Sequence, residues 1–551
     1  MRIALAQLNF VVGDFVENIR KSKEAIGLAK ARGANLIVFP ELSISAYPPQ
    51  DFLEFDDFIT QCYKAALEIA TDCNGITGIV GLPSTNPKRE GKNLFNSAFV
   101  LQEGKITDKV HKALLPNYDI FDEYRYFEPN RHFHCIEINN TKIALTICED
   151  LWNIDDDPMY INCPMDELIR EEPVLMINIA ASPFDYSHAE NRKDILIRNV
   201  KKYKIPLVYV NHVGAQTEII FDGGSVALNA NGDIVKECNY FAEELSFFDF
   251  DEKTRTLKTT ETKVSDAITA PQKIERIHDA LLLGIRDYFH KQGFSKAILG
   301  LSGGIDSALV TVLAVRALGS ENVKVLLMPS EFSSTGSVDD SLKLIHALGI
   351  HHELIPIAKV FDLFGETLSP QFNNLPFNVA EENIQARIRG VLLMAMSNKF
   401  GYILLNTSNK SEIAVGYGTL YGDMCGGISV IGDVYKTEVF ELARFINKDG
   451  EIIPKEIISK APSAELRPNQ KDSDSLPSYD LLDQVLYQYI EQRKGPAELI
   501  QNGFDEALIR RILKLVNTNE YKRYQTPPIL RVSPKSFGMG RRMPIVGRYL
   551  S

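Results

Sequence analysis

Short, β-rich apolar runs alternate with longer segments of helical periodicity along most of the chain, and this alternation restricts the folds open to it. It is typical of α/β proteins, in which helices cover the faces of a β-sheet. In the first half, the runs predicted as strands are 3–8, 36–39, 76–81, 143–147, 174–179 and 207–210. Residues 96–109 and 225–236 each contain two such runs around a Gly-containing turn, which predicts β-hairpins and a mixed sheet.

The alternation stops at residues 251–271 and then starts again. This segment is rich in Asp, Glu, Lys and Thr and lacks a hydrophobic face, and a helical stretch follows Pro271. We therefore expect two domains, 1–250 and 272–551, joined by a linker, as a length of 551 residues also suggests. Strands predicted at 297–301, 323–328, 353–356 and 402–406 indicate a doubly wound parallel sheet in the second domain.

Charge and composition exclude several classes of protein. A net charge of -12 provides no overall field to attract nucleic acid or anionic lipid. No apolar stretch approaches the ~20 residues that cross a bilayer, and the N-terminus lacks the features of a signal peptide. Seven cysteines without a C-x-x-C pair favour a reducing compartment. We expect a cytoplasmic protein with small-molecule ligands and no nucleic-acid or membrane partner.

A glycine-rich loop between a predicted strand and a predicted helix is the sharpest local motif. Paired glycines allow backbone N–H groups to face inward, and the helix start adds partial positive charge, so the loop suits a pyrophosphate. It is not a Walker A element, because no Lys follows the glycines; a simple turn with Asp306 and Ser307 as helix caps is the alternative. The loop comprises Gly300, Leu301, Ser302, Gly303, Gly304, Ile305, Asp306 and Ser307.

This motif after a first strand resembles the PP-loop ATP pyrophosphatase superfamily, whose members adenylate a substrate and release pyrophosphate. Further segments in the same order resemble NAD synthetases, and the similarity covers most of 272–551. They are 382–389, 406–412, 416–423, 432–437 and 540–544. A long polar segment, 463–478, is predicted as an exposed loop of the kind that often forms a lid.

The NAD synthetase resemblance assigns roles to single residues. It implies that residues 300–307, with Thr407 and Lys436, hold ATP as co-substrate, and that Asp306 and Glu412 lie on the Mg²⁺ side. The implied contacts to nicotinic acid adenine dinucleotide are Asn383, Arg387, Glu412 and Lys522. Residues 327–329 depart from ammonia-dependent relatives, which usually carry a basic residue there, so the contacts to adenine are open at this point.

Three residues with chemically reactive side chains follow predicted strand ends in the first domain: Glu41, Lys112 and Cys148. Strand ends of an α/β sheet form a crevice in which distant residues can meet. There a thiolate could attack an amide carbon, a carboxylate could take the thiol proton, and a cation could stabilise the oxyanion. Taken singly, the alternatives are an inert buried thiol, a surface lysine and a loop carboxylate.

The order Glu, Lys, Cys resembles the nitrilase, or carbon–nitrogen hydrolase, superfamily over about residues 1–245, and implies an αββα sandwich. The resemblance implies Glu41 as the base, Lys112 as the oxyanion partner and Cys148 as the nucleophile. Residues 116–127 resemble the glutaminase version, which implies Tyr118 as a substrate contact and Glu123 as a second carboxylate. Ser182 and His188 are implied to receive the amino-acid end of glutamine, with a histidine where many relatives have a longer base.

Together the two resemblances imply the family of glutamine-dependent NAD synthetases, which are carbon–nitrogen ligases. Glutamine would supply ammonia for an adenylated dinucleotide, ATP would yield AMP and pyrophosphate, and the chain would form a homo-oligomer. A water-poor route would keep ammonia in its reactive form. The alternatives are another PP-loop amidotransferase, although those carry unrelated glutaminase domains, and a catalytically silent nucleotide-binding regulator, against which the intact motifs argue.

Overall fold

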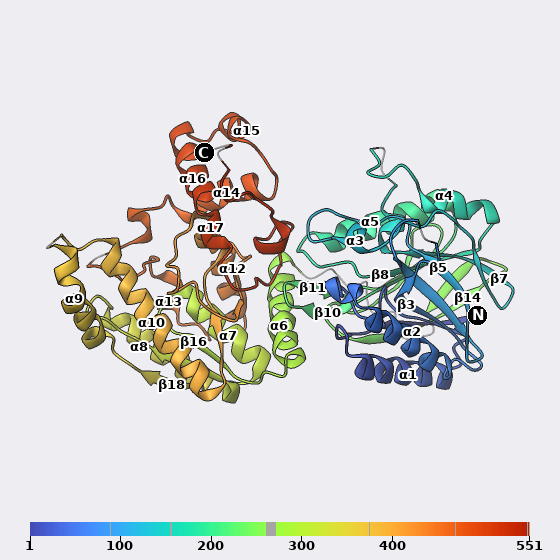
Figure 1. Ribbon diagram of the computed structural model, residues 1–551, viewed down its shortest axis with the longest axis horizontal. Helices are drawn as coiled ribbons and strands as arrows, with labels where there is room; N and C mark the ends of the chain where they lie inside the picture. Colours follow the sequence, from blue (N-terminus) through green and yellow to red (C-terminus); the bar gives the residue numbers. More distant parts are fainter. Residues whose placement is uncertain are drawn as a thin grey trace. The chain divides into compact units, whose positions relative to one another are not determined.

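The computed structural model describes residues 1–88, 90–154, 157–259, 272–373, 375–468, 470–547 and 549. The chain forms two compact units, Met1–Ala270 and Pro271–Ser551 (Figure 1). Part of the segment expected as a linker is instead a strand: β15 (Thr256–Thr259) pairs antiparallel with β14 (Glu244–Asp251). Its single buried apolar residue, Leu257, is too short a signal to predict a strand. Residues 260–271 of the expected linker lie outside the described residues.

Two mixed sheets build the first unit. One has the order β15-β14-β1-β2-β3-β4-β5, and the other has the order β13-β12-β9-β8-β7-β6. Both expected hairpins are present, as β4–β5 and β12–β13. The strands of the first sheet, besides β14 and β15, are β1 (Arg2–Gln7), β2 (Leu36–Val38), β3 (Thr77–Thr85), β4 (Leu94–Gln102) and β5 (Lys105–His111). Those of the second are β6 (Ile136–Ile138), β7 (Thr141–Ile147), β8 (Leu175–Ala180), β9 (Leu207–Asn211), β12 (Val226–Leu228) and β13 (Ile234–Glu237), and β10 (Val213–Gln216) pairs with β11 (Ile219–Asp222).

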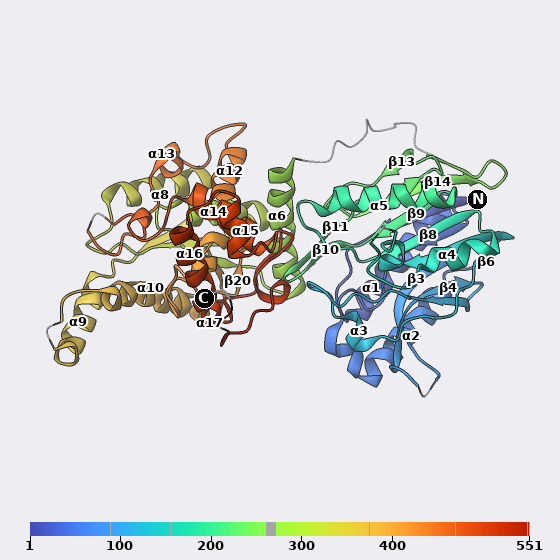
Figure 2. The same cartoon turned by 90° about the horizontal axis from the view of Figure 1, so that it is seen from above.

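The two sheets pack face to face, with helices outside. Apolar side chains of both sheets share one core; Ile3 and Leu5 of β1 and Leu145 of β7 are completely buried in it. Alternation along β1 makes this possible, because residues two apart point to the same face. On the outside lie α1 (Phe15–Ala31) and α2 (Asp56–Ala70), and α4 (Pro164–Leu168) and α5 (His188–Tyr203) (Figure 2). This arrangement is the expected αββα sandwich; a single turn, α3 (Glu123–Tyr126), lies in a connecting segment.

The second unit contains a five-stranded, all-parallel sheet in the order β18-β17-β16-β19-β20. This confirms the predicted doubly wound sheet. The chain order reverses between β16 and β19, and such a reversal places a ligand crevice at the carboxyl ends of the strands. The strands are β16 (Ala297–Gly300), β17 (Val323–Leu327), β18 (His351–Leu354), β19 (Ile403–Asn406) and β20 (Ile428–Ser429).

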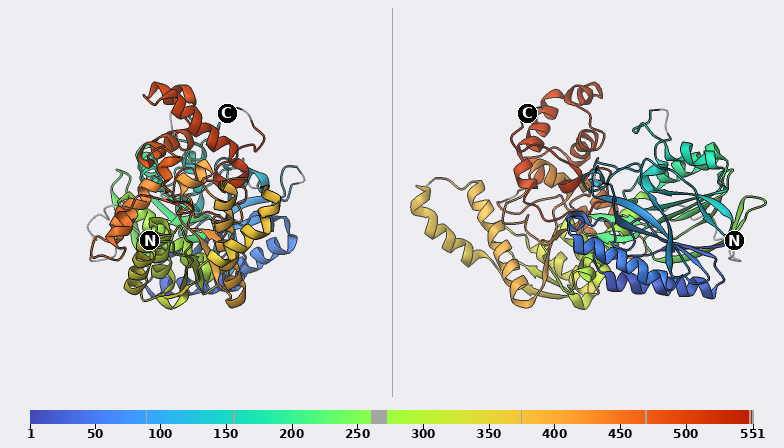
Figure 3. Two further views of the ribbon diagram at one scale, coloured as in Figure 1. Left: turned by 90° about the vertical axis from the view of Figure 1, so that its left-hand side faces the viewer. Right: turned by 45° about the vertical axis from the view of Figure 1, so that its right-hand side comes forward.

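Helices surround this sheet, and a further group packs beside it. One set of mutually packed helices is α6 (Lys273–Lys291), α7 (Ile305–Leu318) and α12 (Lys436–Ile446), whereas α10 (Val379–Phe400) contacts β16 and β19. The remaining helices are α8 (Thr335–Leu348), α9 (Ala358–Phe372), α11 (Lys410–Val415), α13 (Lys455–Ser459), α14 (Tyr479–Ile490), α15 (Pro496–Gln501), α16 (Glu506–Thr518) and α17 (Glu520–Arg523). The orange-red helices α14 and α16 share a separate apolar core with α11 (Figure 3). No helix in the described part of the chain has both the length and the apolar character needed to cross a bilayer.

Candidate active sites

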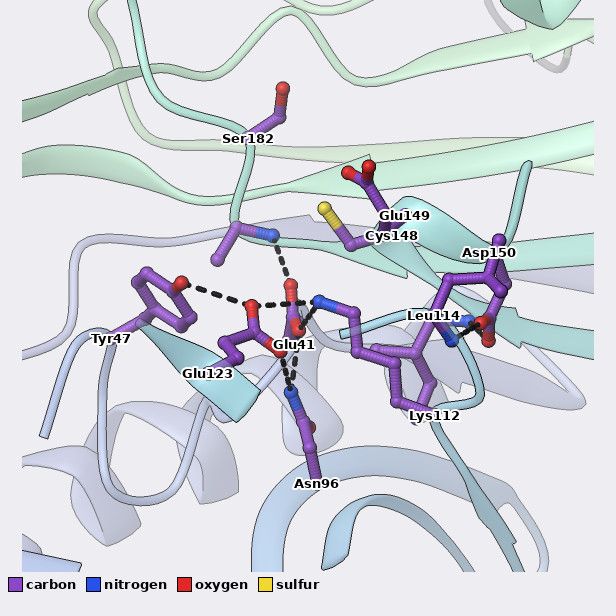
Figure 4. A network of polar contacts seen from close by, with 12 residues as sticks. Glu41, Tyr47, Asn96, Lys112, Leu114, Glu123, Cys148, Glu149, Asp150 and Ser182 are labelled. Carbon is purple, nitrogen blue, oxygen red and sulfur yellow. Dashed lines mark hydrogen bonds and ion pairs between the residues drawn. The ribbon is translucent and has the colours of Figure 1, made fainter. Parts of the chain in front are cut away.

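Glu41, Lys112 and Cys148 meet inside the first unit, each just beyond a strand of one of the two sheets (Figure 4). The Lys112 Nζ lies 2.7 Å from Glu41 Oε1 and 2.8 Å from Glu123 Oε1. The sulfur of Cys148 and the amine of Lys112 project into the same space beside the Glu41 carboxylate (Figure 4). Lys112 is completely buried, so the surface-lysine alternative is wrong. The expected convergence of the three side chains is therefore present.

A sharp backbone turn presents Cys148. Its φ of 45° is in the left-handed region, which is uncommon outside glycine, directly between β7 and a short 3₁₀ turn at Cys148–Leu151. Asp150 holds this turn, because its Oδ2 accepts the Ile147 N–H at 3.0 Å. Its Oδ1 accepts the backbone N–H groups of residues 113 and 114 at 3.0 and 2.9 Å. One carboxylate thus ties the segment after Lys112 to the turn of the cysteine.

Burial and charge set the protonation states of this site. Burial lowers the pKa of Lys112, but the adjacent carboxylates of Glu123 and Glu41 outweigh it and raise the pKa above its usual value. Burial raises the pKa of the Cys148 thiol; the charge of Glu41 adds to this rise and that of Lys112 opposes it. Burial also raises the pKa of Glu123 to about 7, while Lys112 acts in the opposite direction. The site therefore holds a permanent cation beside a thiol that needs a base.

Two residues that contact these carboxylates, Asn96 and Tyr47, were missed in the sequence. The Asn96 Nδ2 donates to Glu41 Oε1 at 2.6 Å and to Glu123 Oε2 at 3.3 Å. The Tyr47 hydroxyl donates to Glu123 Oε1 at 3.0 Å. An available signal was the polar Asn96 within the apolar run of β4, a position that calls for a buried partner.

The residues expected to bind glutamine lie near the cysteine in two groups. The Tyr118 hydroxyl donates to Glu149 Oε1 at 2.8 Å, and the Tyr160 hydroxyl donates to the same oxygen at 3.0 Å. Glu149 directly follows the cysteine, and neither it nor Tyr160 was predicted. In the second group, the Ser182 Oγ lies 2.8 Å from His188 Nε2.

The fold fixes the second group from behind. The Asn211 Oδ1 accepts the Ser182 N–H at 2.8 Å, and its Nδ2 donates to the Ser182 carbonyl at 3.1 Å. The ring of Trp152 stacks on His188 with centroids 5.0 Å apart. The neighbouring Ala181 N–H donates to Glu41 Oε2 at 2.9 Å, so the segment of Ser182 is part of the cysteine site.

A cavity of about 300 Å³ opens at the carboxyl ends of β16, β17 and β19 in the second unit. All eight residues of the glycine-rich loop line it, together with Thr407, Glu412 and Lys436. Gly303 has a φ of 80°, and a Cβ there would lie 2.5 Å from the Ser337 carbonyl oxygen. Only glycine fits this turn, which leads into the first turn of α7. The loop, strand and helix start therefore have the predicted arrangement.

Opposite charges gather beside this loop. The Lys436 amine contacts the Asp306 carboxylate and lies 3.4 Å from Glu412 Oε1. Asn409 donates to Asp306 Oδ1 at 3.0 Å. Burial raises the pKa of Glu412 to about 8; Lys436 opposes this rise and Asp306 adds to it. Burial lowers the pKa of Lys436, but Asp306 and Glu412 outweigh it and raise the pKa above its usual value.

The donor set fits a magnesium ion bound together with phosphates. Among the described residues no group of three or more His, Cys, Asp or Glu side chains could hold a metal ion by itself. Asp306 and Glu412 nevertheless provide two carboxylates next to the phosphate-type loop. Mg²⁺ commonly takes only one or two protein carboxylates and completes its shell with substrate phosphates and water.

Further cavity residues were missed in the sequence. Arg389 of α10 donates from Nε to the Met328 carbonyl at 3.1 Å, and burial lowers the pKa of its guanidinium to about 10. It brings a cation to segment 327–329, which lacks a basic residue of its own. The start of the long polar loop, residues 463–466, also lines the cavity, and Glu465 pairs with Lys460 at 2.8 Å.

Three residues expected to contact the dinucleotide converge on segment 416–420 rather than on the cavity lining. Asn383 accepts the Thr419 hydroxyl at 2.6 Å, and Arg387 donates to the Leu420 carbonyl at 3.2 Å. Lys522 donates to the carbonyls of residues 416 and 418 at 2.7 and 2.9 Å. Their role toward the dinucleotide stays a prediction, whereas Glu412 lies in the cavity.

Two family descriptions match the chain in succession. "Carbon-nitrogen hydrolase" matches residues 2–259, and "NAD synthase" matches residues 277–526. Fold, sites and these matches define an enzyme in which a hydrolase of the nitrilase type precedes a PP-loop NAD synthase. The particular family follows from relatives that are similar along their whole length.

A glutamine-dependent NAD(+) synthetase of Synechocystis sp. is 45% identical over 98% of each chain. One of Thermotoga maritima is 40% identical over 100% of this chain and 99% of its own. The structure of the Acinetobacter baumannii glutamine-dependent NAD+ synthetase in complex with ADP has a TM-score of 0.78 at 37% identity, over 99% and 98% of the two chains. The chain belongs to the family of glutamine-dependent NAD(+) synthetases.

Proposed function

We propose that this chain converts nicotinic acid adenine dinucleotide to NAD, with ATP and glutamine as co-substrates and AMP, pyrophosphate and glutamate as the other products. The observation that carries this proposal is the presence of two complete sets of chemical groups. One set combines Cys148, Lys112 and Glu41; the other combines the glycine-rich loop with Lys436. Each set supplies what one half of the reaction needs.

In the first unit, Glu41 accepts the thiol proton as the sulfur of Cys148 attacks the amide carbon of glutamine. The electron pair of the carbonyl moves to its oxygen, and Lys112 stabilises the resulting negative charge. Collapse of this intermediate returns a proton to the nitrogen and releases ammonia, leaving a thioester. Water then hydrolyses the thioester to glutamate and restores the thiol.

Glutamine is held at its amino-acid end in this proposal. Figure 4 shows Glu149 and Ser182 on different sides of the cysteine sulfur. Tyr118 is hydrogen-bonded to Glu149, and His188 is hydrogen-bonded to Ser182. A charged His188 would pair with the substrate carboxylate, so this contact weakens when the imidazole loses its proton.

In the second unit, the loop residues 300–307 and Thr407 bind the phosphates and the nucleoside of ATP. The carboxylate of the dinucleotide's nicotinic acid attacks the α-phosphorus, and pyrophosphate leaves. Lys436 stabilises the charge that develops. Asp306 and Glu412 would hold magnesium, which would supply charge neutralisation for the phosphates. Ammonia then attacks the acyl carbon of the adenylate and displaces AMP.

We assign Asn383, Arg387 and Lys522 to binding of the dinucleotide. Their common contacts to segment 416–420 support a shared role, because one bound molecule could engage that segment and all three side chains.

We also propose a homo-oligomer in the cytoplasm. Exposed apolar side chains on α9 and α10, including Leu363, Phe364 and Val391, support self-association. All seven cysteines are free, which supports a reducing compartment. Light scattering coupled to size exclusion measures the oligomeric state directly.

An assay with ATP and nicotinic acid adenine dinucleotide, with and without glutamine or ammonium, tests the function. We expect NAD, AMP and pyrophosphate in equal amounts with either nitrogen source. Another PP-loop amidotransferase would produce AMP only with a different acceptor. A silent regulator would bind ATP without forming AMP, and absence of NAD from both sources contradicts the proposal.

A further inference from the structure

Asn96 contacts both carboxylates of the cysteine site from within β4. Its Nδ2 is 2.6 Å from Glu41 Oε1 and 3.3 Å from Glu123 Oε2. Lys112 Nζ bridges the same two side chains from another direction, at 2.7 and 2.8 Å (Figure 4). The two carboxylates are thus joined by one charged donor and one neutral donor.

Hydrogen-bond donors and acceptors fix the orientation of the Asn96 amide. If it were reversed, its oxygen would face two carboxylate oxygens, and acceptors cannot bond to acceptors. In the observed orientation the amide nitrogen donates to both carboxylates. The price is an Oδ1 that is buried and has no hydrogen-bond partner among the described residues, on a side chain with 0% exposure. A buried acceptor left unpaired indicates that the donor end is what this position requires.

Charge balance explains why the second donor is neutral. When both carboxylates are ionised, they and one ammonium leave one net negative charge, which is available to receive a proton. A second cation at position 96 would cancel that charge, and a carboxylate would add to it and repel both glutamates. An amide stabilises the ionised pair without changing the net charge.

The backbone of Asn96 contributes as well. Its carbonyl oxygen accepts the Lys112 N–H at 2.8 Å, and β4 pairs with β5 up to residue 111. The same residue therefore fixes the lysine through its main chain and the two carboxylates through its side chain.

We propose that Asn96 is a positioning residue for glutamine hydrolysis, whose two hydrogen bonds align Glu41 and Glu123 and favour their ionised forms, so that Glu41 can accept the thiol proton of Cys148. This inference rests on the proposed function of the first unit. Asn96 touches neither substrate nor sulfur in this scheme and acts through the two glutamates.

The test uses Asn96→Asp and Asn96→Leu in the full chain. The first keeps the shape and adds a negative charge; the second keeps the approximate volume and removes both donors. The readouts are the pH profile of kcat/KM for glutamine hydrolysis and the rate of Cys148 alkylation by iodoacetamide, located by mass spectrometry. Asn74→Asp, on the exposed surface of the same unit, is the matched control.

We expect the acidic limb of both profiles to move to higher pH, because carboxylates that lose a donor bind protons more readily. The expected shift is about one pH unit for Asn96→Leu and more for Asn96→Asp. Near neutral pH this corresponds to a loss of about tenfold or more. Ammonium-dependent NAD synthesis should stay within about twofold of the unmodified chain, and Asn74→Asp should match the unmodified chain in every readout.

Every other outcome contradicts either the positioning role of Asn96 or the proposed function. A folded variant whose rate falls equally at all pH values, with an unmoved acidic limb, overturns the positioning role. An Asn96→Leu variant that fails to fold, followed through Trp152 fluorescence, shows a structural role and overturns it too. An unmodified chain that does not hydrolyse glutamine, or a Cys148→Ala variant that does, contradicts the proposed function instead.

Discussion

A charged lysine without any solvent contact is stable only if groups of opposite charge lie within contact distance of its amine. Removing an ion from water costs several kcal/mol even after relaxation, so an isolated Lys112 would lose its proton. Glu41 and Glu123 at 2.7 and 2.8 Å prevent this. The second unit buries Lys410 in the same way, 3.0 Å from Asp433 and 2.8 Å from Glu491. Of these two lysines, only Lys112 lies beside a thiol. This neighbour distinguishes the proposed catalytic lysine, Lys112, from the structural lysine, Lys410.

Cys148→Ala tests the division of labour between the two sets of residues. We expect loss of glutamine-dependent NAD synthesis by about 10³-fold or more, because the nucleophile is gone. Ammonium-dependent synthesis should remain, since its groups belong to the second unit. Both rates are measured by the formation of NAD.

Asp306→Ala is the reciprocal variant. It should abolish NAD formation from either nitrogen source, because it removes the carboxylate that pairs with Lys436 in the nucleotide cavity. Retained ammonium-dependent turnover in this variant would show that the ATP site is misplaced.

At the scale of elements, both sites depend on what happens just after a strand. β16 ends at Gly300, and the turn through Gly303, which lines the cavity, delivers the chain into α7. β7 ends at Ile147, and the turn through Cys148 delivers the thiol. Positive φ angles occur at both turns, one on a glycine and one on a cysteine, so local strain is accepted where a group must be aimed.

Gly303→Ala tests the nucleotide turn. A non-glycine residue in the left-handed region costs about 1–2 kcal/mol, and the added Cβ would also overlap the carbonyl of residue 337. We expect ATP affinity, measured by calorimetry, to fall by about tenfold or more. Gly336→Ala is the control, because a Cβ there meets nothing within 4 Å. Equal affinities in the two variants would contradict this account of the loop.

Asp150 gives the cysteine turn a pH dependence. Burial raises its pKa from 3.8 to about 6, although three backbone N–H groups oppose this. Between about pH 4 and pH 6 the Asp150 carboxyl therefore keeps its proton in the native state and loses it in the unfolded state. The stabilisation that this proton gives the native state disappears as pH rises from about 4 to about 6. A shift of about two units corresponds to about 3 kcal/mol in the free energy of unfolding.

Asp150→Asn should remove this slope. The measurement is urea unfolding between pH 4 and 7, followed by fluorescence of Trp152, the only tryptophan of the chain and a residue of the first unit. An unchanged slope in the variant would assign the pH dependence to other groups.

At the scale of the whole molecule, each unit places its site where strands end, but the sheets of the first unit differ in kind from the sheet of the second. The first unit pairs two mixed sheets, and the second has one parallel sheet with the order reversal at β16. The proposed reactions of the two units are linked by ammonia, which one unit would release and the other would consume. Protonation in water converts ammonia to ammonium, which cannot attack an acyl group, so a transfer protected from solvent would raise the yield.

Isotope competition tests that transfer. Glutamine labelled with heavy nitrogen in its amide is supplied together with excess unlabelled ammonium, and the label in NAD is read by mass spectrometry. We expect the label to dominate in NAD even when ammonium exceeds glutamine. Labelling that simply follows the ratio in solution would mean that ammonia passes through the solvent.

The sequence by itself determined the features that local order encodes. Periodicity located β1, β7, β16 and most other strands. The positions of Glu41, Lys112 and Cys148 after strand ends, and the resemblance of their order to the nitrilase superfamily, predicted that they share one site. The glycine-rich loop was equally readable, because its turn depends on residues that are adjacent in the chain. At β18 the pattern was weak, and the strand begins at His351 rather than at residue 353, since its residues are exposed at an edge and carry no burial signal.

Only the tertiary structure decided which groups are paired, buried and charged. Asn96 and Tyr47 escaped sequence reasoning because neither belongs to a local motif. Glu149 directly follows the cysteine and Arg389 ends segment 382–389, but only the fold shows which groups these two side chains contact. The pKa of Glu123, raised to about 7, is also a product of the fold. Desolvation and Coulomb interaction act through space, and the Lys112–Glu41 pair joins residues 71 positions apart. Such terms have no counterpart in the order of residues along the chain.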